Sequence, residues 1–159
     1  MRAPENSEEI TLAMLKNNPV VKKLVETGEE RIGKMGLKER FVFTGLVQPA
    51  RIPELTNAMD IVAHPSRREG LARAIVQGQL AARPVIAYDV DGNREGFVDG
   101  QSGYLIPAFD QKVFERRLAE LLTIDRKEMG ERGREFALAR FSSQKMVEDL
   151  EKVYAEALR

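Results

Sequence analysis

The feature that most constrains the fold is an unbroken succession of strand, turn, helix and strand in the middle of the chain. A short apolar run over residues 60–63 is followed by a turn, and Gly70 opens an amphipathic segment over 71–82. A second apolar run covers 85–88. Strands that alternate with helices form parallel βαβ units, because the helix returns the chain to the starting edge of the sheet. The pattern predicts an α/β, Rossmann-like parallel sheet with helices on both faces.

Periodicity extends this scheme in both directions. Runs of β-branched and aromatic residues predict further strands at 41–44 and 104–106. Apolar residues at helical spacing predict helices over 8–16, 20–35, 53–59, 111–122, 126–140 and a last segment that runs through 158. Three ends carry capping signals: Gly36 after its helix, Asp110 before 111–122, and Ser142 or Ser143 before the last helix.

Length and composition limit the class of protein to which the chain can belong. We expect a polar N-terminal segment over 1–18 and a single domain over 19–159, since 43% apolar residues suffice for one core. Lys plus Arg equals Asp plus Glu at 25 each, and aromatic residues make up 6%, so nucleic acid is not an expected partner. The absence of cysteine excludes a thiolate metal site or a nucleophilic thiol and favours a cytoplasmic location.

No apolar run approaches the roughly 18 to 20 residues that cross a bilayer, and the start MRAPENSEEI lacks the apolar core of a signal peptide. We therefore expect no transmembrane segment. Peripheral contact with a membrane stays open.

A candidate site follows the first central strand. Ligands of α/β sheets bind outside the carboxyl ends of the strands, where helix N-termini present unpaired N–H groups to anions. Glu69 lies just before such a terminus. His64, the single histidine, is expected either to hydrogen-bond the turn or, as an alternative, to act as a general base. Three arginines could neutralise a diphosphate, with Arg73 the best placed, beside Arg67 and Arg68.

Acidic residues follow the next strand but do not form a compact ligand motif. They are Asp89, Asp91, Glu95 and Asp99. Their spacing straddles a strand end and two turns, so we expect no metal.

Six segments, in order, carry a family resemblance. They are RFVFTG (40–45), PS (65–66), EGL (69–71), RPVIA (83–87), DGNRE (91–95) and DGQSGYLI (99–106). Over about residues 29–158 the chain resembles the C-terminal, donor-binding domain of the family-4 retaining glycosyltransferases of GT-B architecture. One departure lies inside the signature: the second acidic residue of the family, eight positions after the first, is Gln77 here.

The resemblance implies roles for individual residues. Glu69 would be the catalytic-site carboxylate that binds hydroxyls of the donor sugar. Gln77 would hold the ribose without the charge of a carboxylate. The other implied substrate-binding residues are Thr44, Gly45, Ser66, Gly70, Leu71, Ala72 and Arg73. The family resembles metal-independent enzymes, so no metal and no cofactor are expected, and the partner would be a nucleotide-sugar or nucleoside diphosphate.

Parts of the resembling enzymes have no counterpart in this chain. The first strands of the usual domain, with the Arg and Lys that clamp the diphosphate, and the acceptor domain are missing. The expected function is hexosyl transfer from a nucleotide-sugar to a glycan or lipid-linked acceptor, with only the donor-binding part present and the isolated chain inactive. The alternatives are a non-catalytic nucleotide-binding or regulatory module and a structural pairing domain. We expect a homodimer, or assembly with a missing N-terminal half.

Overall fold

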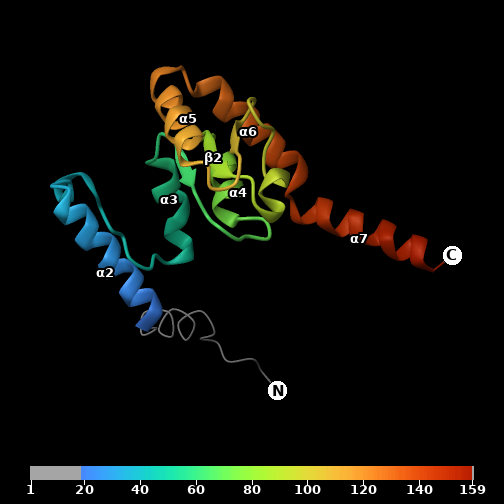
Figure 1. Cartoon of the computed structure of the whole chain (residues 1–159). Helices are drawn as coiled ribbons and strands as arrows, with labels where there is room; N and C mark the ends of the chain where they lie inside the picture. The colour runs from blue at the N-terminus through green and yellow to red at the C-terminus, as the bar shows by residue number, and fades with distance from the viewer. Residues whose placement is uncertain (1–18, 159) are drawn as a thin grey trace. The chain divides into compact units, whose positions relative to one another are not determined.

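The computed structural model describes residues 19–158 (Figure 1). The chain forms two compact units, one that ends at Pro49 and one that begins at Ala50. The helix expected over 8–16 lies outside the described residues.

The described part of the first unit contains one long helix. Helix α2 covers Pro19–Lys34 and is followed by a 3-10 turn, η1, over Lys38–Arg40. Gly36 has a φ of +68°, and the N–H of Leu37 donates to the carbonyl of Ile32 at 3.1 Å. A left-handed glycine with this bond ends helices in the Schellman motif. The predicted C-cap at Gly36 is confirmed.

The strand predicted at 41–44 is wrong. Phe41 has extended backbone angles, but no described residue pairs with the segment, and Val42 is 88% exposed. The rings of Phe41 and Phe43 instead stack on each other with centroids 6.4 Å apart. β-Branched and aromatic residues favour extended backbone, but a strand also needs a hydrogen-bonded neighbour.

The second unit is a parallel α/β structure. The 3-10 turn η2 (Pro49–Arg51) spans the boundary in the sequence. The elements of the second unit are then α3 (Ile52–Asn57), β1 (Val62–His64), α4 (Arg73–Leu80), β2 (Val85–Tyr88), η3 (Asp91–Glu95), β3 (Gly103–Ile106), α5 (Gln111–Thr123), α6 (Lys127–Arg140) and α7 (Ser143–Ala157). The strands form one sheet in the order β1-β2-β3, and both pairings are parallel. The predicted α/β class and parallel sheet are confirmed.

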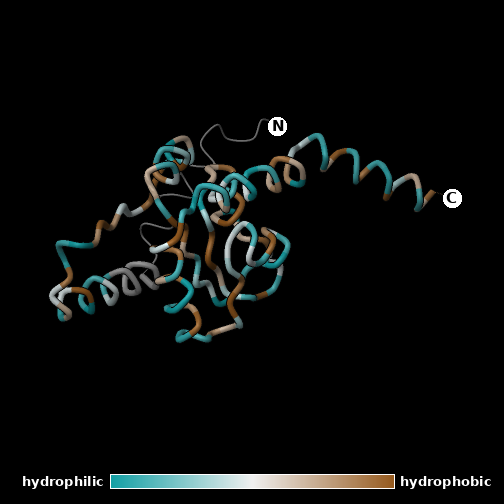
Figure 2. The backbone as a smooth tube through the Cα atoms, turned by 90° about the horizontal axis from the view of Figure 1, so that it is seen from above, coloured by the Kyte–Doolittle hydropathy of each residue, from teal (hydrophilic) through white to brown (hydrophobic). Residues whose placement is uncertain are grey.

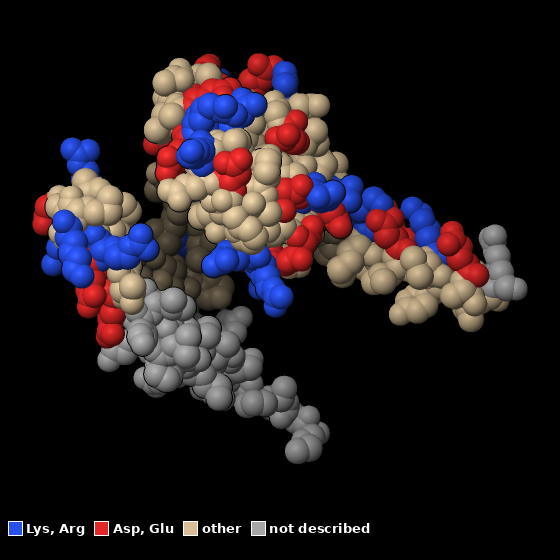
Figure 3. All heavy atoms as spheres, viewed as in Figure 1, with Lys and Arg blue, Asp and Glu red and all other residues tan. Residues whose placement is uncertain are grey.

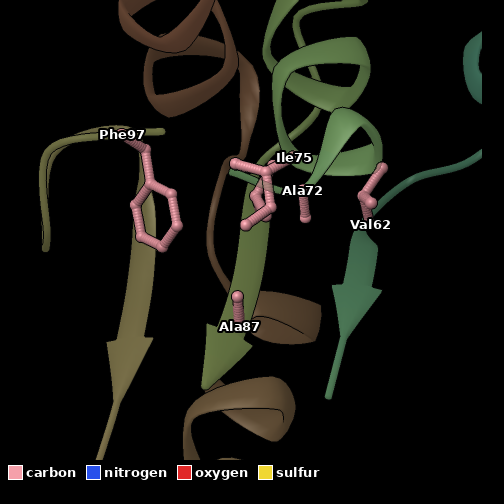
Figure 4. Packing of buried hydrophobic residues seen from close by; sticks show 6 residues of the cluster. Val62, Ala72, Ile75, Ala87 and Phe97 are labelled. Carbon is pink, nitrogen blue, oxygen red and sulfur yellow. The ribbon is translucent and has the colours of Figure 1, made fainter. Parts of the chain in front are cut away.

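Strand β2 is the central strand of the sheet, and its alternate residues belong to two different apolar clusters. Val85 and Ala87 pack with Ile75 of α4, whereas Ile86 packs with Phe114 and Leu121 of α5. Figure 4 shows Ile75 above β2, between Val62 of β1 and Phe97. Helices therefore cover both faces, as predicted, because successive side chains of a strand point to opposite sides.

Helix α6 packs against α4 through glycines. A Cβ at Gly130 would lie 2.1 Å from the carbonyl oxygen of Ala82, and one at Gly133 would lie 1.7 Å from Oε1 of Gln79. The Gln79 side chain is fully buried and donates from Nε2 to Oγ of Ser102 at 3.2 Å. The two helices can approach closely only because these positions lack side chains.

Several boundaries differ from the predictions by a few residues. The strand expected over 60–63 is β1 at Val62–His64, so His64 lies in the strand. The helix expected over 71–82 is α4 at Arg73–Leu80, and Gly70 lies in the preceding turn rather than opening the helix. Both N-cap predictions hold: Asp110 accepts from the N–H of Val113 at 3.0 Å, and Ser142 from that of Lys145 at 3.1 Å.

Helix α7 is amphipathic and contains no buried residue. Its hydropathy alternates along the helix (Figure 2), and Figure 3 shows its charged side chains on one side and the remaining ones on the other. The exposed apolar residues are Met146, Val147, Leu150, Val153 and Tyr154. Within residues 19–158, no helix combines the length and apolarity that crossing a membrane requires.

Candidate functional site

The candidate site lies at the carboxyl ends of β1 and β2. His64 is the last residue of β1, and the loop that follows it leads over Glu69 to the start of α4. The chain leaves β2 at Tyr88 and turns through η3. Since parallel strands end at the same edge, the two loops meet there.

Glu69 and His64 form a direct pair. Nε2 of His64 lies 3.2 Å from Oε1 of Glu69, and the two side chains are 22% and 32% exposed. With the proton on Nε2, the imidazole donates to the carboxylate and fixes its orientation. The structure thus places His64 against the turn, which is the first of its two expected arrangements, and leaves the second carboxylate oxygen of Glu69 for a ligand.

Three successive backbone N–H groups after Glu69 lack an acceptor in the described part of the chain. The N–H groups of Gly70, Leu71 and Ala72 have no partner among residues 19–158. Ala72 is the N-cap of α4, and its side chain cannot accept a hydrogen bond. The helix N-terminus is therefore uncapped, a condition that favours a hydroxyl oxygen or an anion from outside.

Helix α4 contributes polar side chains to this edge. Arg73 begins the helix, and Gln77 follows one turn later on the same side. Arg73 is exposed and forms no ion pair with the described residues. Gln77 is half-buried, and its side chain has no hydrogen-bond partner in the same part of the chain. Both side chains can therefore bind a ligand without first breaking an interaction.

Two further residues of the loop, Ser66 and Arg67, already have partners within the protein, and the side chain of Arg68 is exposed. Oγ of Ser66 donates to the carbonyl of Arg68 at 3.1 Å. The guanidinium of Arg67 lies over the ring of Phe109, 5.1 Å from its centroid. These contacts shape the loop and leave Arg73 as the arginine nearest to the start of α4.

Thr44 and Gly45 belong to the first unit. Gly45 has a φ of +63°, and Oγ1 of Thr44 lies 3.4 Å from its carbonyl oxygen. Of the predicted site residues, the structure brings together His64, Glu69, the 70–72 backbone and α4, all in the second unit. Thr44 and Gly45 lie in the other unit and are described only within it.

Sequence reasoning missed the supporting role of η3. Oδ2 of Asp91 accepts the N–H of Glu69 at 2.9 Å. Asn93 is fully buried, and its Nδ2 donates to the carbonyl of Tyr88 at 3.1 Å. The Asp-Gly-Asn sequence after a strand is a turn signal that could have indicated a loop built on side-chain hydrogen bonds.

The other acidic residues are engaged within the protein. The guanidinium of Arg94 donates hydrogen bonds to the carboxylate oxygens of Asp89 at 2.8 to 3.1 Å. Oδ1 of Asp99 accepts a hydrogen bond from the N–H of Leu105 at 2.9 Å. In the described part of the chain no three metal-ligating side chains gather at one point.

A surface hollow lies at the opposite, amino-terminal edge of the sheet. It has a volume of about 500 Å³, and it is lined by residues before β1 and β2 and by the α5–α6 turn, including Asp60, Arg83 and Arg126. Arg126 lies 3.7 Å from Asp60. The hollow is separate from the edge that holds Glu69, where the uncapped helix and the carboxylate converge.

Fold and site together define an α/β domain whose carboxyl edge can bind hydroxyls and an anion. The family model described as "Glycosyl transferases group 1" matches residues 21–136. EpsD of Bacillus subtilis is 35% identical over 124 residues, which cover 77% of this chain and 32% of that protein. The chain belongs to the group 1 glycosyltransferase family.

Solved structures share the fold of this chain. The Anabaena protein Alr3699/HepE, in a complex with UDP, superposes with a TM-score of 0.71 at 25% identity, covering 94% of this chain and 46% of that one. The C-terminal domain of the group 1 glycosyltransferase LpcC of Francisella tularensis has the same fold, with a TM-score of 0.70 at 20% identity, covering 90% of this chain and 83% of that one. The chain spans about a third of the length of EpsD.

Proposed function

We propose that the chain is the donor-binding part of a retaining, family-4 glycosyltransferase that transfers a hexosyl unit from a nucleotide-sugar to a glycan or lipid-linked acceptor. The observation that carries this proposal is the combination of Glu69 with three N–H groups that have no partner in residues 19–158, at a helix start without a side-chain cap. A carboxylate accepts hydrogen bonds from sugar hydroxyls, and free N–H groups at a helix N-terminus donate hydrogen bonds to a phosphate. The UDP complex of HepE supports a nucleotide ligand.

In this proposal Glu69 is the central residue of the donor site. Gly70, Leu71 and Ala72 contact sugar or phosphate through their backbone, Arg73 attracts the diphosphate, and Gln77 holds the ribose. Ser66, Thr44 and Gly45 complete the set. His64 orients Glu69 and does not exchange protons with the substrate.

Gly70 offers a way to separate binding from folding. A Cβ at Gly70 would meet nothing within 4 Å, and its φ is not in the left-handed region. The fold therefore does not require a glycine there, and the residue fits a need for close approach by a ligand. We expect Gly70→Ala to leave the thermal midpoint nearly unchanged and to weaken nucleotide-sugar binding.

The test is titration calorimetry of the chain with UDP, GDP, ADP and their glucose conjugates. We expect one nucleotide series to bind the wild type and to bind Gly70→Ala at least several-fold more weakly. Gly28→Ala in α2, where an added Cβ also meets nothing within 4 Å, is the matched control. No binding by any series, or equal binding by Gly70→Ala, would contradict the donor-site assignment.

Activity requires more than this part. We propose that residues 19–159 act as one donor-binding domain, that the isolated chain does not transfer sugar, and that catalysis needs an acceptor-binding half. Positioning two substrates is worth about 7 to 11 kcal/mol, and one half-site cannot supply it. Sugar transfer by the pure chain would refute this statement.

The partners and location follow from the same reasoning. We propose a homodimer or association with an acceptor-binding half. We also propose a cytoplasmic setting, because a chain without cysteine gains nothing from an oxidising compartment.

A further inference from the structure

The loop after β2 reaches across to the turn that holds Glu69. Oδ2 of Asp91 accepts the N–H of Glu69 at 2.9 Å, a bond between residues 22 positions apart in the sequence. It acts on the backbone atom next to the Cα from which the Glu69 side chain projects. A shift of that backbone would move the carboxylate relative to His64, which lies 3.2 Å from it.

Asp91 keeps this bond at a conformational cost. Its φ is +45°, in the left-handed region that side chains other than glycine rarely adopt. Asp and Asn tolerate the region better than other residues, but glycine would hold the backbone with less strain. The side chain is therefore the reason to have Asp here, and its described hydrogen bond is the one to Glu69.

The loop is seated firmly enough to act as a support. A Cβ at Gly92 would lie 2.3 Å from the carbonyl oxygen of Gly70, so the two turns touch backbone to backbone. Next along the chain, Asn93 is fully buried and donates to the carbonyl of Tyr88 at the end of β2. The position of the Glu69 turn is thereby tied to the central strand.

We propose that Asp91 is a positioning residue for Glu69: it holds the turn so that the carboxylate faces His64 and the ligand. This statement rests on the proposed function only where it concerns the ligand. The link from Asp91 through Glu69 to His64 is a property of the free chain.

The first test uses His64, the single histidine, as an NMR probe. Glu69→Ala gives the imidazole Cε1–H shift of His64 without its partner. We expect Asp91→Gly to move that shift in the same direction, and Asp91→Asn, whose amide oxygen accepts the same N–H, to keep the wild-type value. Asp91→Gly suits the backbone, so its thermal midpoint should not fall. A His64 shift unmoved in folded Asp91→Gly would overturn the proposal.

The second test is calorimetric titration of the same variants with UDP-glucose. We expect Asp91→Gly to bind about five- to tenfold more weakly, the effect of a lost hydrogen bond of about 1 kcal/mol or slightly more, and Asp91→Asn to bind within about twofold of wild type. A purely structural role would make affinity follow the thermal midpoint. Equal binding by Asp91→Gly would overturn the proposal. If wild type does not bind UDP-glucose, the donor assignment fails and the NMR result alone decides on Asp91.

Discussion

At the scale of single residues, Ala82 holds a backbone conformation that normally belongs to glycine. Its φ is +53°, and it lies directly after the last turn of α4. The N–H of Arg83 donates to the carbonyl of Gly78 at 2.9 Å, which completes a Schellman motif. Asp91 shows the same strain, but there the side chain makes a hydrogen bond, whereas the methyl group of Ala82 gains no comparable partner.

We expect Ala82→Gly to stabilise the protein by about 0.5 to 1 kcal/mol, because the left-handed strain exceeds the added entropy of the unfolded chain. Urea denaturation followed by circular dichroism measures the change. The control is Ala81→Gly, since Ala81 has a φ of −82° and should only lose stability. If Ala82→Gly lowered the free energy of unfolding as much as Ala81→Gly does, the backbone strain at Ala82 would be negligible.

At the scale of elements, the contact between α4 and α6 depends on glycines. We expect Gly130→Ala to destabilise the protein by about 1 to 3 kcal/mol, because the new methyl group meets the backbone oxygen of Ala82 and α6 must move. Gly33→Ala in α2 is the control, because an added Cβ there meets nothing within 4 Å. The better helix propensity of alanine should raise the stability of that variant by up to about 1 kcal/mol. Chemical denaturation of both variants is the measurement, and effects of the same sign would contradict the packing argument.

A polar brace connects β3 to α5 and depends on pH. Oη of Tyr104 donates to Glu120 at 2.7 Å, and Nη1 of Arg117 donates to the other carboxylate oxygen at 2.7 Å. The hydrogen bond from Tyr104, followed by that from Arg117, lowers the pKa of Glu120 below its ordinary value. A lowered carboxyl pKa stabilises the fold above the unfolded-state pKa, and this contribution is lost as the pH falls through the folded-state pKa.

Tyr104→Phe should therefore reduce stability at pH 7 and reduce it less at pH 3, because lowering the pH shifts Glu120 toward its protonated form, which gains less from the tyrosine hydroxyl. Denaturant midpoints at the two pH values test this, with Tyr154→Phe on the exposed side of α7 as the control. A Tyr104→Phe deficit that stays constant between pH 7 and pH 3 would exclude the carboxylate as its source.

The elements show what sequence can and cannot predict. Strand β2 was predicted with its observed ends, because four apolar residues lie between Pro84 and Asp89. The prediction of a strand at 41–44 was wrong because strand pairing depends on a neighbouring strand that the local sequence does not specify. The approach of Asp91 to Glu69 was missed for a similar reason, because it joins two loops that only the parallel sheet brings together. Family motifs located the Glu69 turn, and no local rule located its support.

At the scale of the whole molecule, two apolar features are exposed within the described residues. One is the extended segment with Phe41, Val42 and Phe43, and the other is the apolar side of α7. Among residues 19–158, strand β1 pairs only with β2, so its other edge has no partner there. Unpaired edges and exposed apolar segments favour association between chains.

Static light scattering at tens of micromolar should therefore give about twice the 17.9 kDa of one chain. Val42→Lys places a charge on the extended segment and should shift the mass toward the monomer if that segment forms the interface. Leu158→Lys, at the end of α7, tests the helix instead. A monodisperse particle of 17.9 kDa for the wild type would rule out the homodimer.

The central position of β2 also determines the order in which parts of the second unit open. Val85, Ile86 and Ala87 have no exposed surface, and β2 is hydrogen-bonded on both sides. Its amide protons can exchange with deuterated water only when the whole unit unfolds, whereas those of α7 can exchange by local fraying. The loops at the carboxyl edge lie between these extremes. A bound nucleotide should slow deuterium uptake at residues 69–73. The amides of β2 already exchange only through global unfolding, so their exchange rate measures the stability of the whole unit.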